Sequence, residues 1–187
     1  MGVQSLKVRL REIVSADETR SLSICVYCPS RRQTIPMEEC KGCARAQEVS
    51  PRGVVCTPVE ESGKAVTAGM AATHHAVCVR GDVPGRLLVS LAAEEPWHLA
   101  VIDERDRFLG FVASRRLAGV PRGRTVLDQV PAYRLASGAA LAIHESESLR
   151  DALRMMAHHG TRVLALLDDD GVYRGELNDL EALRALA

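Results

Sequence analysis

The sequence predicts a mixed α/β (α+β) protein in which a small β-rich, metal-binding module precedes one domain built from two copies of a βαββα unit. Two observations support this prediction. Four cysteines near the N-terminus form two Cys-x2-Cys pairs, and from about residue 65 onward the order of helix, strand and turn signals repeats. We place the parts at residues 1–50 (module), 51–61 (linker) and 62–187 (paired repeats, the first about 62–120 and the second about 121–187).

Composition narrows the class of protein. Aromatic residues make up only 3% of the 187 residues, so the core must consist mainly of Ala, Val, Leu and Ile. Lys+Arg and Asp+Glu both number 24, and this balance argues against a nucleic-acid binder, which needs a basic surface. No secretory signal opens the sequence, and no apolar run approaches the ~20 residues that span a bilayer. We therefore expect a cytoplasmic protein without membrane contact, whose paired cysteines bind metal instead of forming disulfides.

The N-terminal module begins with a strand signal and continues with the cysteines. Leu6, Val8 and Leu10 alternate with basic residues, as on a half-buried strand. Two Cys-x2-Cys pairs follow, separated by 11 residues, and each pair can place two thiolates on one metal ion. The metal ligands expected from this spacing are Cys25, Cys28, Cys40 and Cys43.

Zinc is the metal expected at this site, and iron in a rubredoxin-like site is the alternative. Four thiolates leave no coordination position for water, which disfavours hydrolytic catalysis. Metal binding would supply the folding free energy that about 40 residues cannot obtain by burial alone. Cys56 is an alternative ligand that we do not expect to bind the metal, and Cys78, between Val77 and Val79, is expected to be a small buried side chain.

The first repeat contains helix and strand signals in the order of a βαββα unit. Pro84 precedes a helix with one apolar face, formed by Leu87, Leu88, Leu91 and Ala92. A buried strand at 99–102, a charged turn and a second strand at 108–112 follow, and Ser114 opens a short helix. Two such units bury their apolar faces best against each other, which predicts one globular domain.

The second repeat contains the clearer helix signals. Ser148 and Asp151 form a capping-box-like start, and Gly160 marks the end of the helix. Strands are expected at 163–167 and 172–177. Asn178 then opens a last helix, in which three leucines are expected to face the core: Leu180, Leu183 and Leu186.

Two segments carry a resemblance to a known family. They are Ala100-Val101-Ile102-Asp103 followed by Phe108-Leu109-Gly110-Phe111-Val112, and Ala165-Leu166-Leu167-Asp168 followed by Gly171 and Tyr173-Arg174-Gly175-Glu176-Leu177. This pattern resembles a tandem pair of CBS domains, named after cystathionine β-synthase, over roughly residues 62–187. The resemblance implies a regulatory protein whose two repeats form a disc with two clefts, which often bind adenosine-containing ligands. Such discs often dimerise.

The resemblance also points to ligand-binding positions. In ligand-binding members, a Thr or Ser three residues after the strand glycine, and an Asp three residues further, hold the ribose. The first repeat has Ala113 and Arg116 there, so it lacks both groups. The second repeat has Asn178 and Glu181, which can bond to base or ribose, and Arg162 can meet a phosphate. Asn-x-x-Glu at a helix start is equally a capping box, which explains both residues without a ligand.

We therefore expect a non-enzymatic regulatory or sensor protein. Its paired repeats would bind AMP, ADP, ATP or S-adenosylmethionine and signal through the zinc-stabilised module, and the chain would form a homodimer through the repeats. The sequence specifies no protein partner. Three alternatives stay open: a dimerisation scaffold without ligand, a ligand-responsive nucleic-acid-binding regulator, and an iron redox protein.

Overall fold

The computed structural model describes residues 4–57, 66–72, 76–94, 98–118, 127, 129–137 and 141–186. Residues 58–61 of the expected linker and the side chain of Arg116 lie outside this description. No described helix is both long and apolar enough to cross a membrane.

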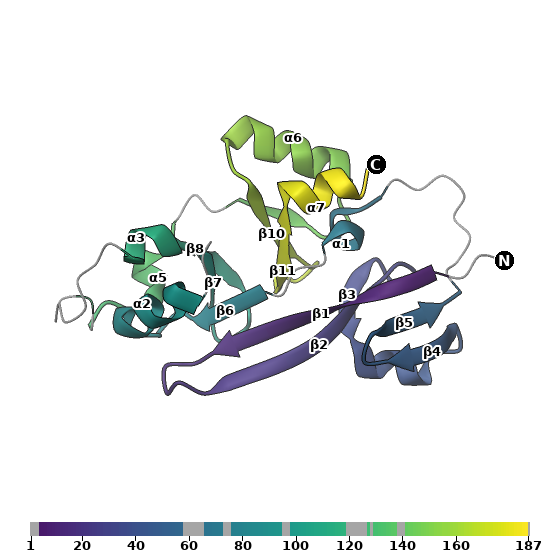
Figure 1. Ribbon diagram of the computed structural model, residues 1–187, viewed down its shortest axis with the longest axis horizontal. Coiled ribbons are helices and arrows are strands. Elements are labelled where there is room, and N and C mark those ends of the chain that lie inside the picture. Colours follow the sequence, from purple (N-terminus) through teal and green to yellow (C-terminus); the bar gives the residue numbers. More distant parts are fainter. Residues whose placement is uncertain are drawn as a thin grey trace.

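The largest sheet joins the N-terminal region to the first repeat. Its strands follow the order β3-β2-β1-β6-β7-β8, and Figure 1 shows the long β1–β2 hairpin running beside both repeats. β1 (Gln4–Val14) pairs antiparallel with β2 (Arg20–Cys28) and parallel with β6 (Ala76–Arg80). The sheet is therefore continuous across the boundary that we expected between module and repeats.

A smaller arrangement of strands completes the N-terminal region. β3 (Gln33–Pro36) pairs with β2 and leads into the 3-10 helix η1 (Met37–Gly42). β4 (Ala46–Ser50) pairs with β5 (Gly53–Cys56), and β5 pairs with the start of β1. Residues 53–56, which we assigned to the linker, thus form a strand of the N-terminal region.

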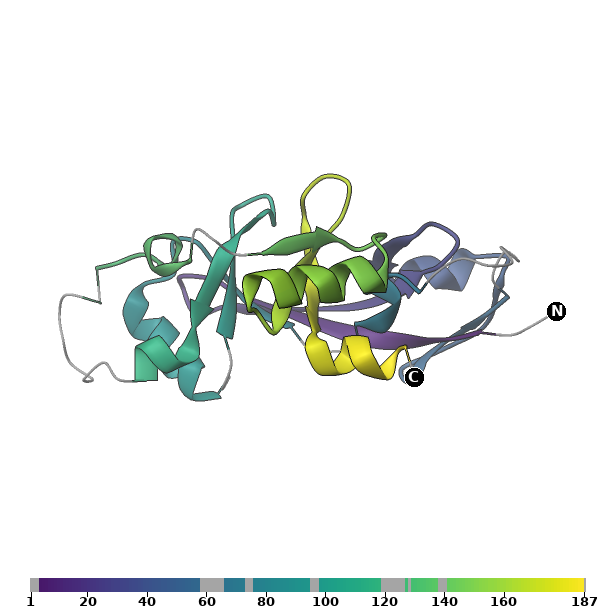
Figure 2. The same cartoon turned by 90° about the horizontal axis from the view of Figure 1, so that it is seen from above.

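The two repeats have the expected βαββα order. In the first, β6 is followed by α2 (Gly85–Glu94), β7 (His98–Ile102), β8 (Phe108–Ala113) and α3 (Ser114–Ala118). In the second, the elements are β9 (Ala142–His144), α6 (Leu149–His159), β10 (Val163–Leu167), β11 (Tyr173–Asn178) and α7 (Asp179–Arg184). The mixed α+β fold is therefore confirmed. β9, β10 and β11 form a separate sheet in the order β11-β10-β9, and Figure 2 shows α6 and α7 together on one side of it.

The short helix that precedes each repeat packs in the core of the other repeat. The short helix α1 (Ala68–Ala71) precedes the first repeat, yet its alanines pack in the core of the second with Leu149 and Leu164. Conversely, α5 (Ala132–Leu135) precedes the second repeat and packs in the core of the first through Ala132. This exchange ties the repeats together, because neither core is complete without the other's segment.

The expected helix ends are confirmed in the second repeat. The Ser148 side chain accepts a hydrogen bond from the Asp151 backbone N–H, and Gly160 ends α6 with φ 62°. Asn178 and Glu181 form a reciprocal capping box at the start of α7. These bonds satisfy backbone donors that the first helical turn leaves unpaired.

The orientation predicted for the last helix is wrong. Leu180, Leu183 and Leu186 are 54%, 55% and 46% exposed. Instead, α7 buries Glu181 and Ala182. Three leucines spaced three residues apart indicate one helix face but do not say which way it points, and here that face is covered by no described part of the chain.

Candidate functional site

A cavity of about 220 Å³ lies between the two repeats. His98, at the start of β7, contributes a wall from the first repeat. The second repeat contributes the end of β11, the start of α7 and the residues around the start of β10: Arg162, Val163, Glu176, Asn178, Asp179 and Leu180. A molecule bound here would contact both repeats at once.

Two polar pairs line this cavity. His98 Nε2 lies 2.6 Å from Glu176 Oε2, so this pair links the repeats directly. Arg162 Nε donates to Asp179 Oδ2 at 2.8 Å. The hydrogen bond from Arg162 lowers the pKa of Asp179, so this carboxylate stays charged well below neutral pH. The cavity therefore offers both a cation and an anion to a ligand.

Two of the three predicted ligand contacts line the cavity, and the third does not. Asn178 and Arg162 line the cavity, whereas Glu181 is not among the described residues that do. Glu181 is 8% exposed, and its Oε2 accepts a hydrogen bond from the Asn178 backbone N–H at 3.2 Å. Sequence reasoning missed His98, Glu176 and Asp179. Asp179 directly follows the predicted Asn178, which was the available signal, but nothing in the sequence places His98 against the second repeat.

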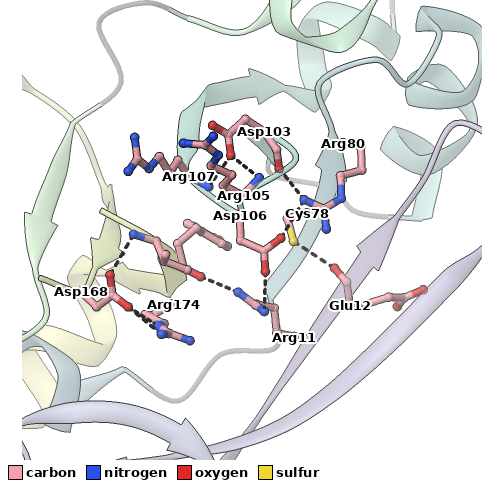
Figure 3. A network of polar contacts seen from close by, with 12 residues as sticks. Arg11, Glu12, Cys78, Arg80, Asp103, Arg105, Asp106, Arg107, Asp168 and Arg174 are labelled. Atoms are coloured by element: carbon pink, nitrogen blue, oxygen red, sulfur yellow. Dashed lines mark hydrogen bonds and ion pairs between the residues drawn. The ribbon is translucent and has the colours of Figure 1, made fainter. Parts of the chain in front are cut away.

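A network of charged side chains joins β1 to both repeats (Figure 3). Arg11 Nη2 lies 3.0 Å from Asp106 Oδ2 in the β7–β8 turn, and Arg11 Nη1 donates to the Tyr173 carbonyl at 2.7 Å. Arg80 from β6 pairs with the other oxygen of Asp106 at 2.7 Å. The Tyr173 backbone N–H donates to the Asp106 carbonyl at 2.8 Å. Arg11 thus contacts one repeat through a carboxylate and the other through a backbone oxygen.

The second repeat has a matching turn in this network. Asp168 Oδ1 accepts hydrogen bonds from the backbone N–H groups of Asp170 and Val172. In the first repeat, Asp103 Oδ1 accepts the equivalent hydrogen bonds from Arg105 and Arg107. Burial raises the pKa of Asp168, but the Val172 N–H and the Arg174 guanidinium outweigh it and hold that pKa below its usual value. Arg174 Nη2 lies 2.6 Å from Asp168 Oδ2.

A second junction joins β3 to the second repeat. Glu145 is fully buried, and its carboxylate accepts hydrogen bonds from the Thr34 N–H at 2.6 Å and the Thr34 hydroxyl at 2.5 Å. Arg9 is 6% exposed and donates to the Thr34 hydroxyl oxygen at 3.3 Å. Burial lowers the pKa of Arg9, and the nearby carboxylates of Glu145 and Glu181 oppose this effect. Arg9 therefore lies within electrostatic reach of the helix beside the cavity.

The predicted cysteine ligands do not all come together. Cys28, Cys40 and Cys43 line a cavity of about 350 Å³ in the N-terminal region, and Cys56 lines it too. Cys25 is not among the described residues that line it. Burial raises the pKa of Cys40, and the charges of Cys28, Cys43 and Cys56 raise it further. Across the described residues, no three His, Cys, Asp or Glu side chains are already arranged as a metal-binding group.

Comparison with known proteins agrees with this architecture. Residues 135–187 match the family model of the CBS domain. None of the curated proteins compared with the chain matches it significantly. Among solved structures, the cystathionine β-synthase pair domain from Shewanella oneidensis MR-1 aligns with a TM-score of 0.54 and 17% identity, over 68% of this chain and 72% of that one. The fold is therefore that of a CBS pair.

Two further solved structures share this fold. The soluble part of a magnesium transporter aligns with a TM-score of 0.56 and 13% identity, over 66% of this chain and 48% of that one. CBSX2 in complex with AMP aligns with a TM-score of 0.50 and 23% identity, over 58% of this chain and 85% of that one. The chain thus spans about half the length of the transporter structure.

Proposed function

We propose that this chain is a regulatory protein whose CBS pair binds an adenosine-type ligand. Binding would change the arrangement of the two repeats, and the N-terminal hairpin would respond to that change. The observation that carries the proposal is the cavity shared by the two repeats, lined by His98 on one side and by Asn178 and Asp179 on the other. AMP bound to CBSX2, a protein of the same fold, supports this ligand class.

The polar pairs of the cavity suit a nucleotide. Arg162 is 71% exposed, and an exposed ion pair contributes about 0–1 kcal/mol, so Arg162 can leave Asp179 at little cost and meet a phosphate. The freed Asp179 carboxylate can then accept hydrogen bonds from ribose hydroxyls, while Asn178 offers an amide. Glu181 keeps its capping role in this arrangement.

The cavity must widen to admit the ligand. Its 220 Å³ lies below the roughly 300–1,000 Å³ of ligand pockets in proteins. The His98–Glu176 contact of 2.6 Å is the direct link between the two walls. A ligand that replaces this contact favours one relative arrangement of the repeats, which is a population shift.

The hairpin is positioned to respond to that shift. Arg11 bonds to Asp106 in the first repeat and to Tyr173 in the second, so it contacts both bodies that the ligand would rearrange. Arg9 lies near Glu145 and Glu181 of the second repeat. We propose that β1 carries the signal to a metal-stabilised N-terminal region.

A homodimer completes the proposal. The leucines of α7 form an exposed apolar stripe, and a second copy of the chain would bury it. A ligand-free dimerisation scaffold is the second candidate function. The observation that favours it is the capping box, which already satisfies Asn178 and Glu181 without any ligand.

Thermal shifts with AMP, ADP, ATP, S-adenosylmethionine and S-adenosylhomocysteine test the proposal. We expect at least one to raise the melting temperature saturably, because a ligand that binds only the folded state stabilises it. Asp179→Ala and Arg162→Ala should reduce the shift, whereas Arg150→Ala, at an exposed position of α6, should retain it. No shift with any of the five would reject ligand binding and leave the scaffold.

A further inference from the structure

The two cysteines of the first Cys-x2-Cys pair point to opposite faces of a strand. Both lie within β2, which runs from Arg20 to Cys28. Successive side chains of a strand alternate between its faces, so residues three apart lie on opposite sides. Val26 and Cys28 pack in the apolar cluster of the N-terminal region. On the other face, beside Cys25, the Tyr27 hydroxyl accepts a hydrogen bond from Thr67 at 3.0 Å, so that face is directed toward the repeats.

The second pair has the geometry of a chelating turn. Cys40 lies in η1, and Cys43 caps that helix with its N–H donating to the Cys40 carbonyl at 3.1 Å. The Ala46 N–H then donates to the Cys43 carbonyl at 3.0 Å, and Ala46 is the partner of Cys56 in the β4–β5 ladder. Cys56 is thereby brought to the turn that holds the second pair.

A shared cavity joins these three cysteines to Cys28. Its wall combines the four thiols with apolar side chains, and Cys40 and Cys56 are buried. Arg31 and Arg45 line the same cavity. Glu39 lines it too and pairs with Arg31 at 2.6 Å. Zn²⁺ with four thiolates carries about two net negative charges, of which the Arg45 guanidinium would offset part.

We propose that one Zn²⁺ binds Cys28, Cys40, Cys43 and Cys56, and that Cys25 is not a ligand. This inference rests on the proposed metal-stabilised N-terminal region and names its ligands. Because the four side chains are not yet arranged around a common centre, they must rotate into rotamers that bring each sulfur to about 2.3 Å from the metal. The closed site would hold β2, η1 and β5 together, and β1 pairs with both of these strands.

Metal content and cobalt spectra of single variants test the ligand set. The full chain is purified with zinc, and the zinc is then exchanged for Co²⁺, whose charge-transfer and ligand-field bands report thiolate number and tetrahedral geometry. We expect one metal per chain, a four-thiolate spectrum, and an unchanged spectrum in Cys25→Ser. Cys56→Ser should lose thiolate intensity and weaken zinc binding at least about tenfold. A spectrum changed by Cys25→Ser and retained in Cys56→Ser would overturn the assignment.

Thiol mapping of the wild-type chain avoids variants that fail to fold. Alkylation followed by mass spectrometry, with and without a chelator, should show metal-dependent protection of Cys28, Cys40, Cys43 and Cys56. Cys25 and Cys78 are both buried, so a change in their reactivity reports opening of the structure on metal removal, and Cys25 should gain no more reactivity than Cys78, the reference. Protection of Cys25 in place of Cys56 overturns only the ligand set. A chain that binds no zinc overturns the metal-stabilised region as well, and the nucleotide thermal shifts report the repeats separately.

Discussion

Arg11 and Asp106 are 95 positions apart in the sequence, yet their side chains form an ion pair of 3.0 Å between the N-terminal hairpin and the first repeat. The Arg11 and Asp106 side chains are 13% and 24% exposed, so the pair is largely shielded from water. The same guanidinium donates to the Tyr173 carbonyl of the second repeat. One side chain thus fixes three parts of the molecule relative to one another.

A double-mutant cycle of Arg11→Ala and Asp106→Ala should therefore reveal a coupling free energy of about 1–2 kcal/mol in urea unfolding. The exposed pair of Arg20 and Glu94, at 3.3 Å, is the matched control, and its coupling should stay below about 1 kcal/mol. Equal couplings for the two pairs would mean that the Arg11 junction is an ordinary surface contact.

Gly69 of α1 packs tightly against Tyr27 of the hairpin. A Cβ at this position would lie 2.3 Å from Tyr27 Cε2 and 2.9 Å from the Glu145 carbonyl oxygen. Gly69→Ala should therefore destabilise the protein by about 1–3 kcal/mol in thermal or urea unfolding, because the two elements must move apart. Gly42→Ala is the control, since a Cβ there meets nothing within 4 Å. Unchanged stability of Gly69→Ala would show that the hairpin does not pack here as described.

Glu145 predicts a pH dependence of stability. Burial raises the pKa of this carboxyl above its usual value, although the Thr34 hydrogen bonds and Arg9 oppose the shift. An acid with a raised pKa in the folded state stabilises the fold at low pH, and this contribution is lost as the pH rises through the folded-state pKa. The free energy of unfolding of the wild type minus that of Glu145→Gln should therefore fall as the pH rises from about 4.3.

Urea unfolding at a series of pH values measures this difference, and Glu147→Gln, at an exposed position, is the control. A difference that increases with pH would show that Thr34 and Arg9 outweigh burial and lower the pKa. Only the change of this difference with pH is interpreted, so the pH-independent cost of leaving Arg9 without this carboxylate does not affect the result.

The exposed leucines of α7 predict the oligomeric state. Leu183 is 55% exposed, and a homodimer that covers the α7 stripe would bury it. Leu183→Glu should convert the dimer to a monomer, because an unpaired charge is costly in an apolar interface. Light scattering coupled to size exclusion measures this, with Leu22→Glu, at a 59% exposed position of β2, as the control. A wild-type monomer, or a dimer unaffected by Leu183→Glu, would exclude this interface.

The elements that local rules specify were predictable from the sequence. Ser148 and Gly160 bound α6 because capping and left-handed φ are properties of single residues, and the apolar run of β10 needed no tertiary information. The burial of Cys78 followed from its apolar neighbours.

The features that depend on long-range pairing could not be predicted. Alternation indicated β1, but nothing local shows that its basic face, with Arg9 and Arg11, is directed toward the two repeats. The spacing of Cys25 and Cys28 suggests a chelating knuckle only if the chain turns there, and the extended backbone of β2 separates the two side chains. Cys56 joins the other cysteines only through the pairing of β4 with β5.

Hydrogen exchange of the zinc-loaded full chain, with and without saturating AMP, ATP or S-adenosylmethionine, tests the central claim most directly. We predict that at least one ligand slows exchange both around β11 and α7, which line the cavity, and in β1 and β2, which are not among the described elements that line it. Protection confined to the cavity, or no change with any ligand, would contradict the proposal that the hairpin responds to a ligand bound between the repeats.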